Sequence, residues 1–359
     1  MNMRLNRLLA TVTLAAGVAS GGPIGYSQTN LTSDVSGLAV NTDPNLKNPW
    51  GMSFGLTSPF WVSNQVTNVA TLYNAAGVAQ SLVVSTPPVG FPPPSGPTGQ
   101  VFVGGLGFTT MSGGSATFVF ATLTGSIDAW NGGTSAITQF TAPDAAVYTG
   151  LAQAGSLLYA ADTRNGKIDV FNSSFQKTTV PGAFANASIP AGFTPYNIQN
   201  VGGKLYVEYA KGITPAGFVG VFDANGNLLQ NISDAHLNAP WGVTLAPVGF
   251  GQFGGDLLVG NFGDGKINAF DPVSGAFVGT LSDMSGNPIV DSGLWSLQFR
   301  SSSQSTFDSN TLFFTAGINN QTDGLFGEIQ VATPEPGTLS MLGLGLGVVA
   351  FAFRRSATS

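Results

Sequence analysis

The sequence contains no cysteine and only one histidine, His236, among its 359 residues. A disulfide framework and a thiol nucleophile are therefore excluded, and the usual nitrogen and sulfur ligands of zinc are almost absent. Charged residues are also scarce, at 8% of the chain, against roughly 25% in an average soluble domain. The formal net charge of −6 leaves no basic surface to neutralise phosphates, so we expect no nucleic-acid partner.

Glycine and apolar residues are plentiful. The chain holds 49 glycines, and hydrophobic residues make up 43% of it, which is enough for a large core. Between Gln28 and Thr333 there are 8 lysines and arginines against 17 aspartates and glutamates, a formal charge of −9. A sparse, acidic surface rich in small polar residues is what we expect of an exported protein without disulfides.

The N-terminus has the pattern of a secretory signal peptide, which we place at residues 1–27. Arg4 and Arg7 precede a short apolar run from Leu8 to Ala19, and a short cationic segment before such a run directs export. Small residues allow cleavage near Ala19 or near Ser27. A buried first helix is the alternative, but two glycines and a proline directly after the run disfavour it.

The C-terminus combines a short motif, an apolar stretch and a basic pair within residues 333–359. The apolar stretch, about 339–353, is shorter than the roughly 20 residues that span a bilayer comfortably, yet it predicts a short transmembrane helix. The basic pair after it is expected to stay cytoplasmic, with the main domain outside. A plain anchor or a buried helix is the alternative. The sorting residues are Pro334, Glu335, Pro336, Arg354 and Arg355.

This tail resembles the PEP-CTERM sorting signal of Gram-negative bacteria. The resemblance implies recognition, and apparently cleavage, by the membrane enzyme exosortase. It also implies an inner-membrane anchor before processing, and then a place in the cell envelope or outside the cell. Many proteins with this signal come from bacteria that make extracellular polysaccharide. Polysaccharide and surface proteins are therefore expected partners.

Between the two ends, a strand–turn–strand unit recurs six times. In each unit an apolar strand leads through a tight polar turn to a second strand that carries an aromatic or apolar anchor. The anchors are spaced by about 51 residues, which is typical of propeller repeats. Alternation of apolar and small polar residues indicates strands. The units lie at 60–73, 118–130, 158–171, 205–222, 257–270 and 312–329.

A further motif precedes most units and predicts the innermost strand of a propeller blade. In it a proline fixes the entry, a glycine allows close approach near a crowded axis, and an aromatic packs between blades. With an outer strand, each unit makes a four-stranded blade, so residues 30–331 are expected to form an all-β, six-bladed β-propeller. Asn30 to Val40 would close the ring as the outer strand of the sixth blade. Pro87 to Gly99 is predicted to be a surface loop.

The motifs at Leu31–Ala39, Thr42–Gly51 and Leu237–Gly242 resemble an uncharacterised family of exported propellers related to NHL and lactonase-like six-bladed propellers. Members of that family often carry a PEP-CTERM tail. The resemblance implies the fold but no assigned activity.

Four polar residues lie at or near the ends of the second strands of four predicted blades and are candidate ligands at the channel mouth: Asn64, Asp162, Glu208 and Asn261. The resemblance to lactonase-like propellers implies that such a cluster can hold a divalent cation such as calcium through oxygen ligands. That cation would polarise an ester carbonyl. The alternative is that these residues start the following turn through bonds to their own backbone, and then no cofactor is required.

Other residues have a functional and a structural interpretation. His236 is either a general base or a loop residue, and no Gly-x-Ser-x-Gly motif accompanies it. Asp128, Asp169 and Asn268 recur at matching places, which favours a role in the repeat over a catalytic pair. The last group consists of three tryptophans, which either stack against sugar rings or pack in the core: Trp50, Trp241 and Trp295.

Three functions are compatible with the sequence. The first is an exported binding or scaffold protein at the envelope or in extracellular matrix. The second is a metal-dependent lactonase-like hydrolase, and the third is a structural role in a surface layer. Few residues in the sequence are candidates for catalysis. This scarcity favours the binding or scaffold function and makes an enzyme the less expected outcome.

Overall fold

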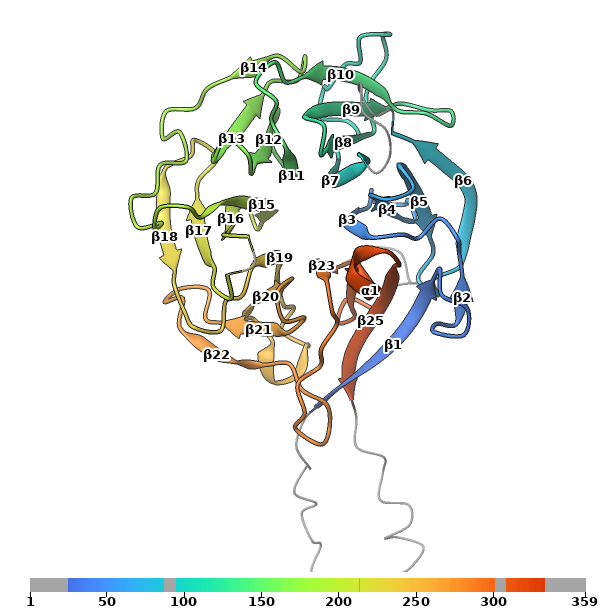
Figure 1. Cartoon of the computed structure of the whole chain (residues 1–359), viewed down its shortest axis with the longest axis vertical. Helices are drawn as coiled ribbons and strands as arrows, with labels where there is room; N and C mark the ends of the chain where they lie inside the picture. Colours follow the sequence, from blue (N-terminus) through green and yellow to red (C-terminus); the bar gives the residue numbers. More distant parts are fainter. Residues whose placement is uncertain (1–24, 87–94, 213, 301–307, 333–359) are drawn as a thin grey trace, which may run out of the picture. The chain divides into compact units, whose positions relative to one another are not determined.

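Six β-sheets are arranged as blades around a central axis in the computed structural model (Figure 1). The structure describes residues 25–86, 95–212, 214–300 and 308–332, and Gly25–Ala332 form one unit. The predicted six-bladed, all-β propeller is thereby confirmed, with one strand-rich repeat per blade. Residues 1–24 and the sorting tail from 333 lie outside the described residues.

Each blade runs outward from an inner strand. Blade one contains β3 (Pro49–Ser53), β4 (Phe60–Asn64), β5 (Val69–Tyr73) and β6 (Ala79–Ser85). Blade two contains β7 (Pro97–Phe102), β8 (Phe118–Thr122), β9 (Ser126–Trp130) and β10 (Ile137–Thr141). Blade three contains β11 (Tyr148–Ala154), β12 (Leu157–Asp162), β13 (Lys167–Phe171) and β14 (Lys177–Thr178).

The second half of the ring repeats this order. Blade four contains β15 (Thr194–Val201), β16 (Lys204–Ala210), β17 (Phe218–Phe222) and β18 (Leu228–Ile232). Blade five contains β19 (Pro240–Leu245), β20 (Leu257–Asn261), β21 (Ile267–Phe270) and β22 (Phe277–Thr280). Blade six contains β23 (Leu294–Phe299), β24 (Leu312–Ala316), β25 (Leu325–Ala332), β1 (Gly25–Ser33) and β2 (Asn41–Thr42). The helical elements described are η1 (Gly251–Phe253) and α1 (Ile318–Gln321).

Glycine near the start of the inner strands allows the blades to converge. A Cβ atom on Gly51 would lie 2.5 Å from the Thr98 carbonyl oxygen of the next blade. A Cβ atom on Gly99 would lie 2.2 Å from the Leu151 nitrogen of the blade after that. Both distances are far below van der Waals contact, so no side chain fits at these positions. This confirms the crowded axis expected from the sequence.

The hydrophobic core is divided among the blade interfaces. Six buried clusters each join two neighbouring blades, and a seventh lies among the inner strands. Between blades six and one, for example, the ring centroids of Phe60 and Phe313 are 4.5 Å apart. Because each blade has one neighbour on either side, the sheets are buried on both faces and their central strands are almost continuously apolar.

The ring is closed by the N-terminal strand, as predicted, but with different bounds. β1 pairs antiparallel with β25 from Gly25 to Ser33, whereas the sequence suggested Asn30 to Val40. The strand ends at Ser33 because the following residues turn back, and β2 then adds a short parallel pair with β1. The described propeller therefore begins at Gly25, five residues before the predicted start.

The prediction of a loop at Pro87 to Gly99 is wrong for its last residues. Pro97 to Gly99 are buried and begin β7, the inner strand of blade two. The proline- and glycine-rich composition hid this strand, although its proline and glycine occupy the same places as in β3 and β19. Residues 87–94 lie outside the described residues.

Among the described residues, no helix is long and apolar enough to cross a membrane. The predicted helix at about 339–353 lies outside them.

The closing strand is anchored by Tyr26. Its side chain is 1% exposed, its hydroxyl donates to the Phe250 carbonyl oxygen at 3.1 Å, and its ring stacks on Phe253. We expect Tyr26→Ala to lower the free energy of unfolding by about 3–5 kcal/mol, and Tyr26→Phe by about 1 kcal/mol. Urea denaturation measures both.

The control for this prediction is Val40→Ala, at a position where the side chain is 74% exposed, and we expect a change below about 0.5 kcal/mol. If Tyr26→Ala were as stable as this control, the closing strand would not contribute to the cooperative unit.

Candidate functional site

Three tryptophans from different blades meet among the inner strands. Trp50 and Trp295 stack with their ring centroids 3.7 Å apart, and Trp241 meets Trp295 edge-on at 5.6 Å. All three are buried, and Tyr196 and Phe262 pack against them. Of the two interpretations of these tryptophans, core packing is therefore the one observed. This tryptophan cluster fills part of the centre of the ring.

A cavity of about 290 Å³ lies against the tryptophan cluster and shares Trp241 with it. We call it the axial cavity. All six inner strands contribute to its wall, so it is located where the blades converge. None of the described residues that line it is charged. Its polar lining includes Ser53, Gln100, Gln153, Gln199, Asn200 and Gln298.

The amide side chains of the axial cavity connect neighbouring blades. Gln100 of blade two donates to the carbonyl oxygens of Gly51 and Trp61 in blade one, at 2.8 Å each. Asn197 of blade four donates to the Trp241 carbonyl oxygen of blade five at 2.6 Å. These bonds hold the wall rigid, as a preorganised site requires.

Sequence reasoning missed these residues. Gln100, Gln199 and Gln298 lie inside inner strands, and Gln100 and Gln298 have only apolar or small residues beside them in the sequence. A glutamine at such a place was the available signal, since a buried amide needs hydrogen-bond partners, which for Gln100 come from the neighbouring blade.

The four predicted ligands are fully buried and lie in four different blades. Asn64 donates to the Thr71 hydroxyl at 2.8 Å, within blade one. Asp162 accepts from the Asn165 amide at 2.7 Å, in the turn that follows it. Asn261 donates to the His236 carbonyl oxygen at 2.7 Å and to Asp264 at 3.0 Å. Asp162 also accepts from the Asn165 backbone N–H at 3.2 Å, as the alternative interpretation expects, whereas the Asn261 side chain bonds the Asp264 side chain and the backbone of the loop at His236. A ligand role for the four residues stays a prediction.

Glu208 differs from the other three. Neither of its carboxylate oxygens has a hydrogen-bond partner within the described structure. Burial raises its pKa well above the ordinary value, and the neighbouring Asn197 amide offsets only part of that rise. A buried carboxyl without a cationic partner is neutral at pH 7 when its pKa is raised far enough.

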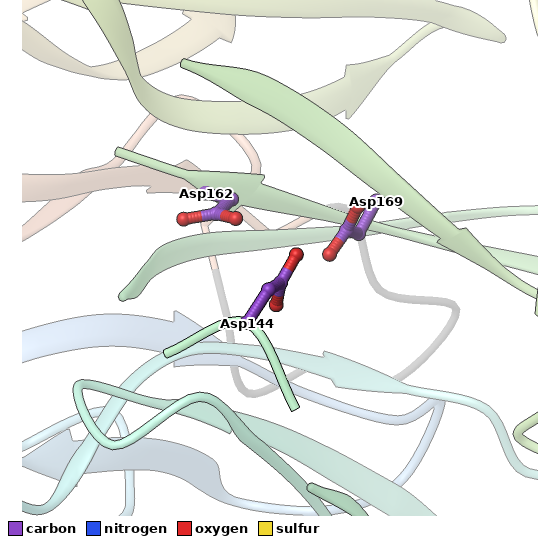
Figure 2. Close-up of side chains that lie close together, drawn as sticks. All are labelled: Asp144, Asp162 and Asp169. Atoms are coloured by element: carbon purple, nitrogen blue, oxygen red, sulfur yellow. The ribbon is translucent and has the colours of Figure 1, made fainter. Parts of the chain in front are cut away.

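One group of acidic residues among those described is close enough to share a metal ion. Asp144, Asp162 and Asp169 place one oxygen each within 4.8 Å of one another (Figure 2). Asp162 is the only one of the four predicted ligands in this group. Asp144 is exposed on the loop before β11, while Asp162 and Asp169 are buried on β12 and β13.

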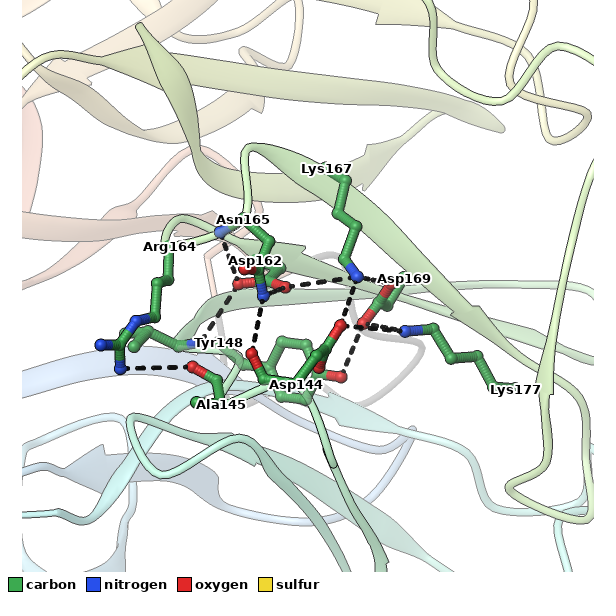
Figure 3. A network of polar contacts seen from close by, with 10 residues as sticks. Asp144, Ala145, Tyr148, Asp162, Arg164, Asn165, Lys167, Asp169 and Lys177 are labelled. Atoms are coloured by element: carbon green, nitrogen blue, oxygen red, sulfur yellow. Dashed lines mark hydrogen bonds and ion pairs between the residues drawn. The ribbon is translucent and has the colours of Figure 1, made fainter. Parts of the chain in front are cut away.

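Two lysines occupy the space beside these carboxylates (Figure 3). The Lys167 Nζ atom lies 2.6 Å from Asp144 and 3.5 Å from Asp169, and the Lys177 Nζ atom lies 2.7 Å from Asp169. The Tyr148 hydroxyl also donates to Asp169 at 2.8 Å. Two ammonium groups leave the three carboxylates with a formal charge of only −1. The group is thus an ion-pair network that joins the loop at Asp144 to β13 and β14.

The residues at matching places in the third strands are buried and serve their own blades. Asp169 belongs to the ion-pair network, and Asn268 donates to the His236 carbonyl oxygen at 2.8 Å. Asp128 on β9 is 0% exposed, and among the described residues neither of its oxygens has a partner that meets the geometry of a hydrogen bond, although two hydroxyls lie nearby. Burial raises the pKa of Asp128 to about 7, and the hydroxyls of Thr138 and Ser126 offset only part of the rise.

The single histidine lies outside the axial cavity. The His236 ring stacks on Phe277 at 3.6 Å between centroids, and its Nδ1 atom is 2.7 Å from Asp234.

Sequence comparison with known proteins places the chain in a family. Residues 332–356 match the PEP-CTERM protein-sorting motif. Over 325 residues the chain is 34% identical to "Uncharacterized protein R648" of Acanthamoeba polyphaga mimivirus, covering 83% of this chain and 78% of that protein. The chain belongs to the same protein family. A second member, "Uncharacterized protein L690" of the same virus, is 32% identical and is covered over 84% of its length.

Solved structures of low sequence identity share the fold of this family member. Virginiamycin B lyase from Staphylococcus aureus superposes with a TM-score of 0.52 at 13% identity, covering 86% of this chain and all of that one. The soluble aldose sugar dehydrogenase from Escherichia coli gives a TM-score of 0.54 at 11% identity with the same coverage. The expected likeness to lactonase- and NHL-like propellers is confirmed at the level of the fold.

The raised pKa of Asp128 predicts a pH dependence of stability. The folded state holds this proton up to about pH 7, whereas the unfolded chain releases it near pH 4. Stability should therefore fall as the pH rises between these values, by up to about 4 kcal/mol from this group. Asp128→Asn lacks this titrating group. The free energy of unfolding of the variant should therefore fall less than that of the wild type between pH 4 and pH 8, as measured by urea unfolding.

The matched control is Asp223→Asn, because bonds from Asn227 hold the pKa of the half-buried Asp223 below its ordinary value. We expect this control to leave the dependence of the unfolding free energy on pH unchanged above pH 5. If wild type and Asp128→Asn showed the same pH dependence, the raised pKa of Asp128 would be contradicted.

Proposed function

We propose that the chain is an exported binding or scaffold propeller, sorted to the cell envelope through its tail and binding its ligand in the axial cavity. The sorting motif carries the first half of this proposal. It begins at residue 332, where the last strand of the propeller ends, so the tail follows the closed ring directly. The motif implies sorting by exosortase. Surface proteins, matrix components and the membrane are the proposed partners.

The lining of the axial cavity supports binding rather than catalysis. Amides and hydroxyls donate and accept hydrogen bonds but do not transfer protons readily near pH 7. None of the described lining residues is a carboxylate, a histidine or a lysine. The alternative is a lactonase-like hydrolase with a bound divalent cation. Three of its predicted ligands, Asn64, Asp162 and Asn261, already bond to neighbouring groups of the protein, so this alternative stays a prediction.

The domain boundaries are part of the proposal. We infer a signal peptide within residues 1–27, a propeller from 25 to 332 and the sorting tail from 333 to 359. Of the two cleavage regions compatible with the sequence, cleavage near Ser27 would remove Gly25 to Ser27 from β1. It would also remove the buried side chain of Tyr26.

We therefore predict that the N-terminus of the exported protein precedes Gly25. Cleavage near Ala19 leaves the whole of β1 paired with β25, which keeps the ladder and the Tyr26 contacts intact. N-terminal sequencing or intact mass spectrometry of the protein purified from the envelope measures this. A mature N-terminus at Gln28 would contradict it.

Replacing Pro334, Glu335 and Pro336 by alanine tests the sorting half of the proposal. We expect the variant to accumulate in the membrane with its tail attached, because the processing enzyme no longer recognises it. Its melting temperature should be unchanged, since the motif lies after the last strand. Fractionation with immunoblotting and intact mass measure the outcome in a strain that has an exosortase.

The control is Asp308→Asn, an exposed change within the propeller, which should be sorted as wild type. Normal sorting and processing of the triple variant would refute this half of the proposal.

A further inference from the structure

We propose that Asn131 is a site of spontaneous covalent modification, at which the side-chain amide is converted to a carboxylate as the protein ages. The reaction joins Asn131 to Gly132 for a time and needs only water from outside the protein. It does not depend on the proposed function, since neither the axial cavity nor the sorting tail takes part. The structure distinguishes this residue from two others that have the same neighbour in the sequence.

The reaction is an attack of a peptide nitrogen on the side chain that precedes it. The Gly132 nitrogen loses its proton to hydroxide and bonds to the Asn131 Cγ atom. The bond between Cγ and Nδ2 breaks, and ammonia leaves with a proton taken from water, which restores the hydroxide. Water then opens the five-membered imide at either carbonyl, which gives aspartate or its isomer linked through the side chain. Glycine favours the attack because no Cβ atom obstructs it.

Three asparagines are followed by glycine, and each pair lies in a turn between strands of one blade: Asn131–Gly132 in blade two, Asn165–Gly166 in blade three and Asn225–Gly226 in blade four. All three asparagines are exposed. The sequence therefore does not rank them, because the attacking nitrogen belongs to glycine in every case.

The first observation that ranks them is the state of the attacking N–H group. The Gly166 nitrogen donates to the Asp162 carbonyl oxygen at 3.0 Å, and the Gly226 nitrogen donates to the Asp223 carbonyl oxygen at 3.0 Å. The Gly132 nitrogen makes no hydrogen bond within the described structure. A bonded N–H group has to leave its acceptor before it can lose its proton and attack, and the Gly132 group does not.

The second observation is the space around the turn. A Cβ atom on Gly132 would have no neighbour within 4 Å, whereas one on Gly226 would lie 2.9 Å from the Phe184 nitrogen. The Asn131 amide is also held only by bonds of 3.2 and 3.3 Å, at the long end of the usual range. The Asn165 amide, by contrast, donates to a carboxylate at 2.7 Å. Asn131 can therefore rotate into the geometry of the imide most easily.

The modification changes a contact between two loops of blade two. The Asn131 amide donates to the Thr110 hydroxyl and to the Gly113 carbonyl oxygen, in the loop between β7 and β8. A carboxylate has no proton to donate, so it would face the Gly113 oxygen as a second acceptor. The loop keeps its bond from the Met111 nitrogen to the Gln139 side chain at 2.7 Å. We therefore expect this loop to open more often while the propeller stays folded.

The test is incubation of the purified, folded protein at pH 8 and 37 °C, followed by protease digestion at pH 5 and peptide mass spectrometry. The converted fraction at each of the three asparagines is followed with time. We expect Asn131 to convert about 3- to 10-fold faster than Asn165 and Asn225, which is the factor that release of one hydrogen bond accounts for. Equal rates at the three positions in the folded protein would overturn the inference.

The matched control is the same incubation in urea, which removes the hydrogen bonds of the folded state. The three asparagines should then convert at similar rates, because each is followed by glycine. If Asn131 kept its full lead in urea, the preference would come from the sequence and the structural argument would be wrong.

Two variants test the effect on the loop between β7 and β8. Asn131→Asp introduces the product directly, and we expect faster amide hydrogen exchange in this loop at an unchanged melting temperature. The control is Asn225→Asp, which makes the same change of charge at an exposed side chain of another blade. It should leave exchange in the loop as in wild type. If Asn131→Asp exchanged no faster than this control, the inferred effect on the loop would be refuted.

Discussion

The convergence of six inner strands on one axis is the constraint on which the rest of the molecule depends. Glycines at Gly51 and Gly99 leave space only for backbone, because a Cβ atom there would overlap the next blade. The same crowding brings Trp50, Trp241 and Trp295 into mutual contact. Directly after Gly99, the Gln100 amide reaches across to the neighbouring blade. The packed centre and the axial cavity are thus two consequences of one geometry.

Stability has to come from packing and backbone ladders, since no disulfide is possible. Each blade interface contains its own apolar cluster, and the pairing of β1 with β25 joins the ends of the ring. The pairing with β1 covers the edge of β25, at which the protein could otherwise associate with itself. Against this background, buried carboxyls such as Asp128 and Glu208 lower stability when ionised, because no cationic partner faces them within the described structure.

The acidic group in blade three shows how proximity of carboxylates can be misread. Asp144, Asp162 and Asp169 are close enough for a metal ion, yet Lys167 and Lys177 already neutralise most of their charge. Their geometry ties a loop to the outer strands of the blade. The axial cavity has the opposite character, because none of the described residues that line it is charged.

The sequence by itself determined the repeat, the number of blades, the closing role of the N-terminal strand and the sorting tail. Each of these is encoded locally, in the alternation of apolar residues, in turn glycines and in short motifs. The tertiary structure decided which polar residues meet. Asn64, Asp162, Glu208 and Asn261 occupy matching places in the repeat, but their side chains serve four separate blades. Ser53 and Gln100 look unremarkable in the sequence, yet both line one cavity, because consecutive blades pack their inner strands β3 and β7 side by side.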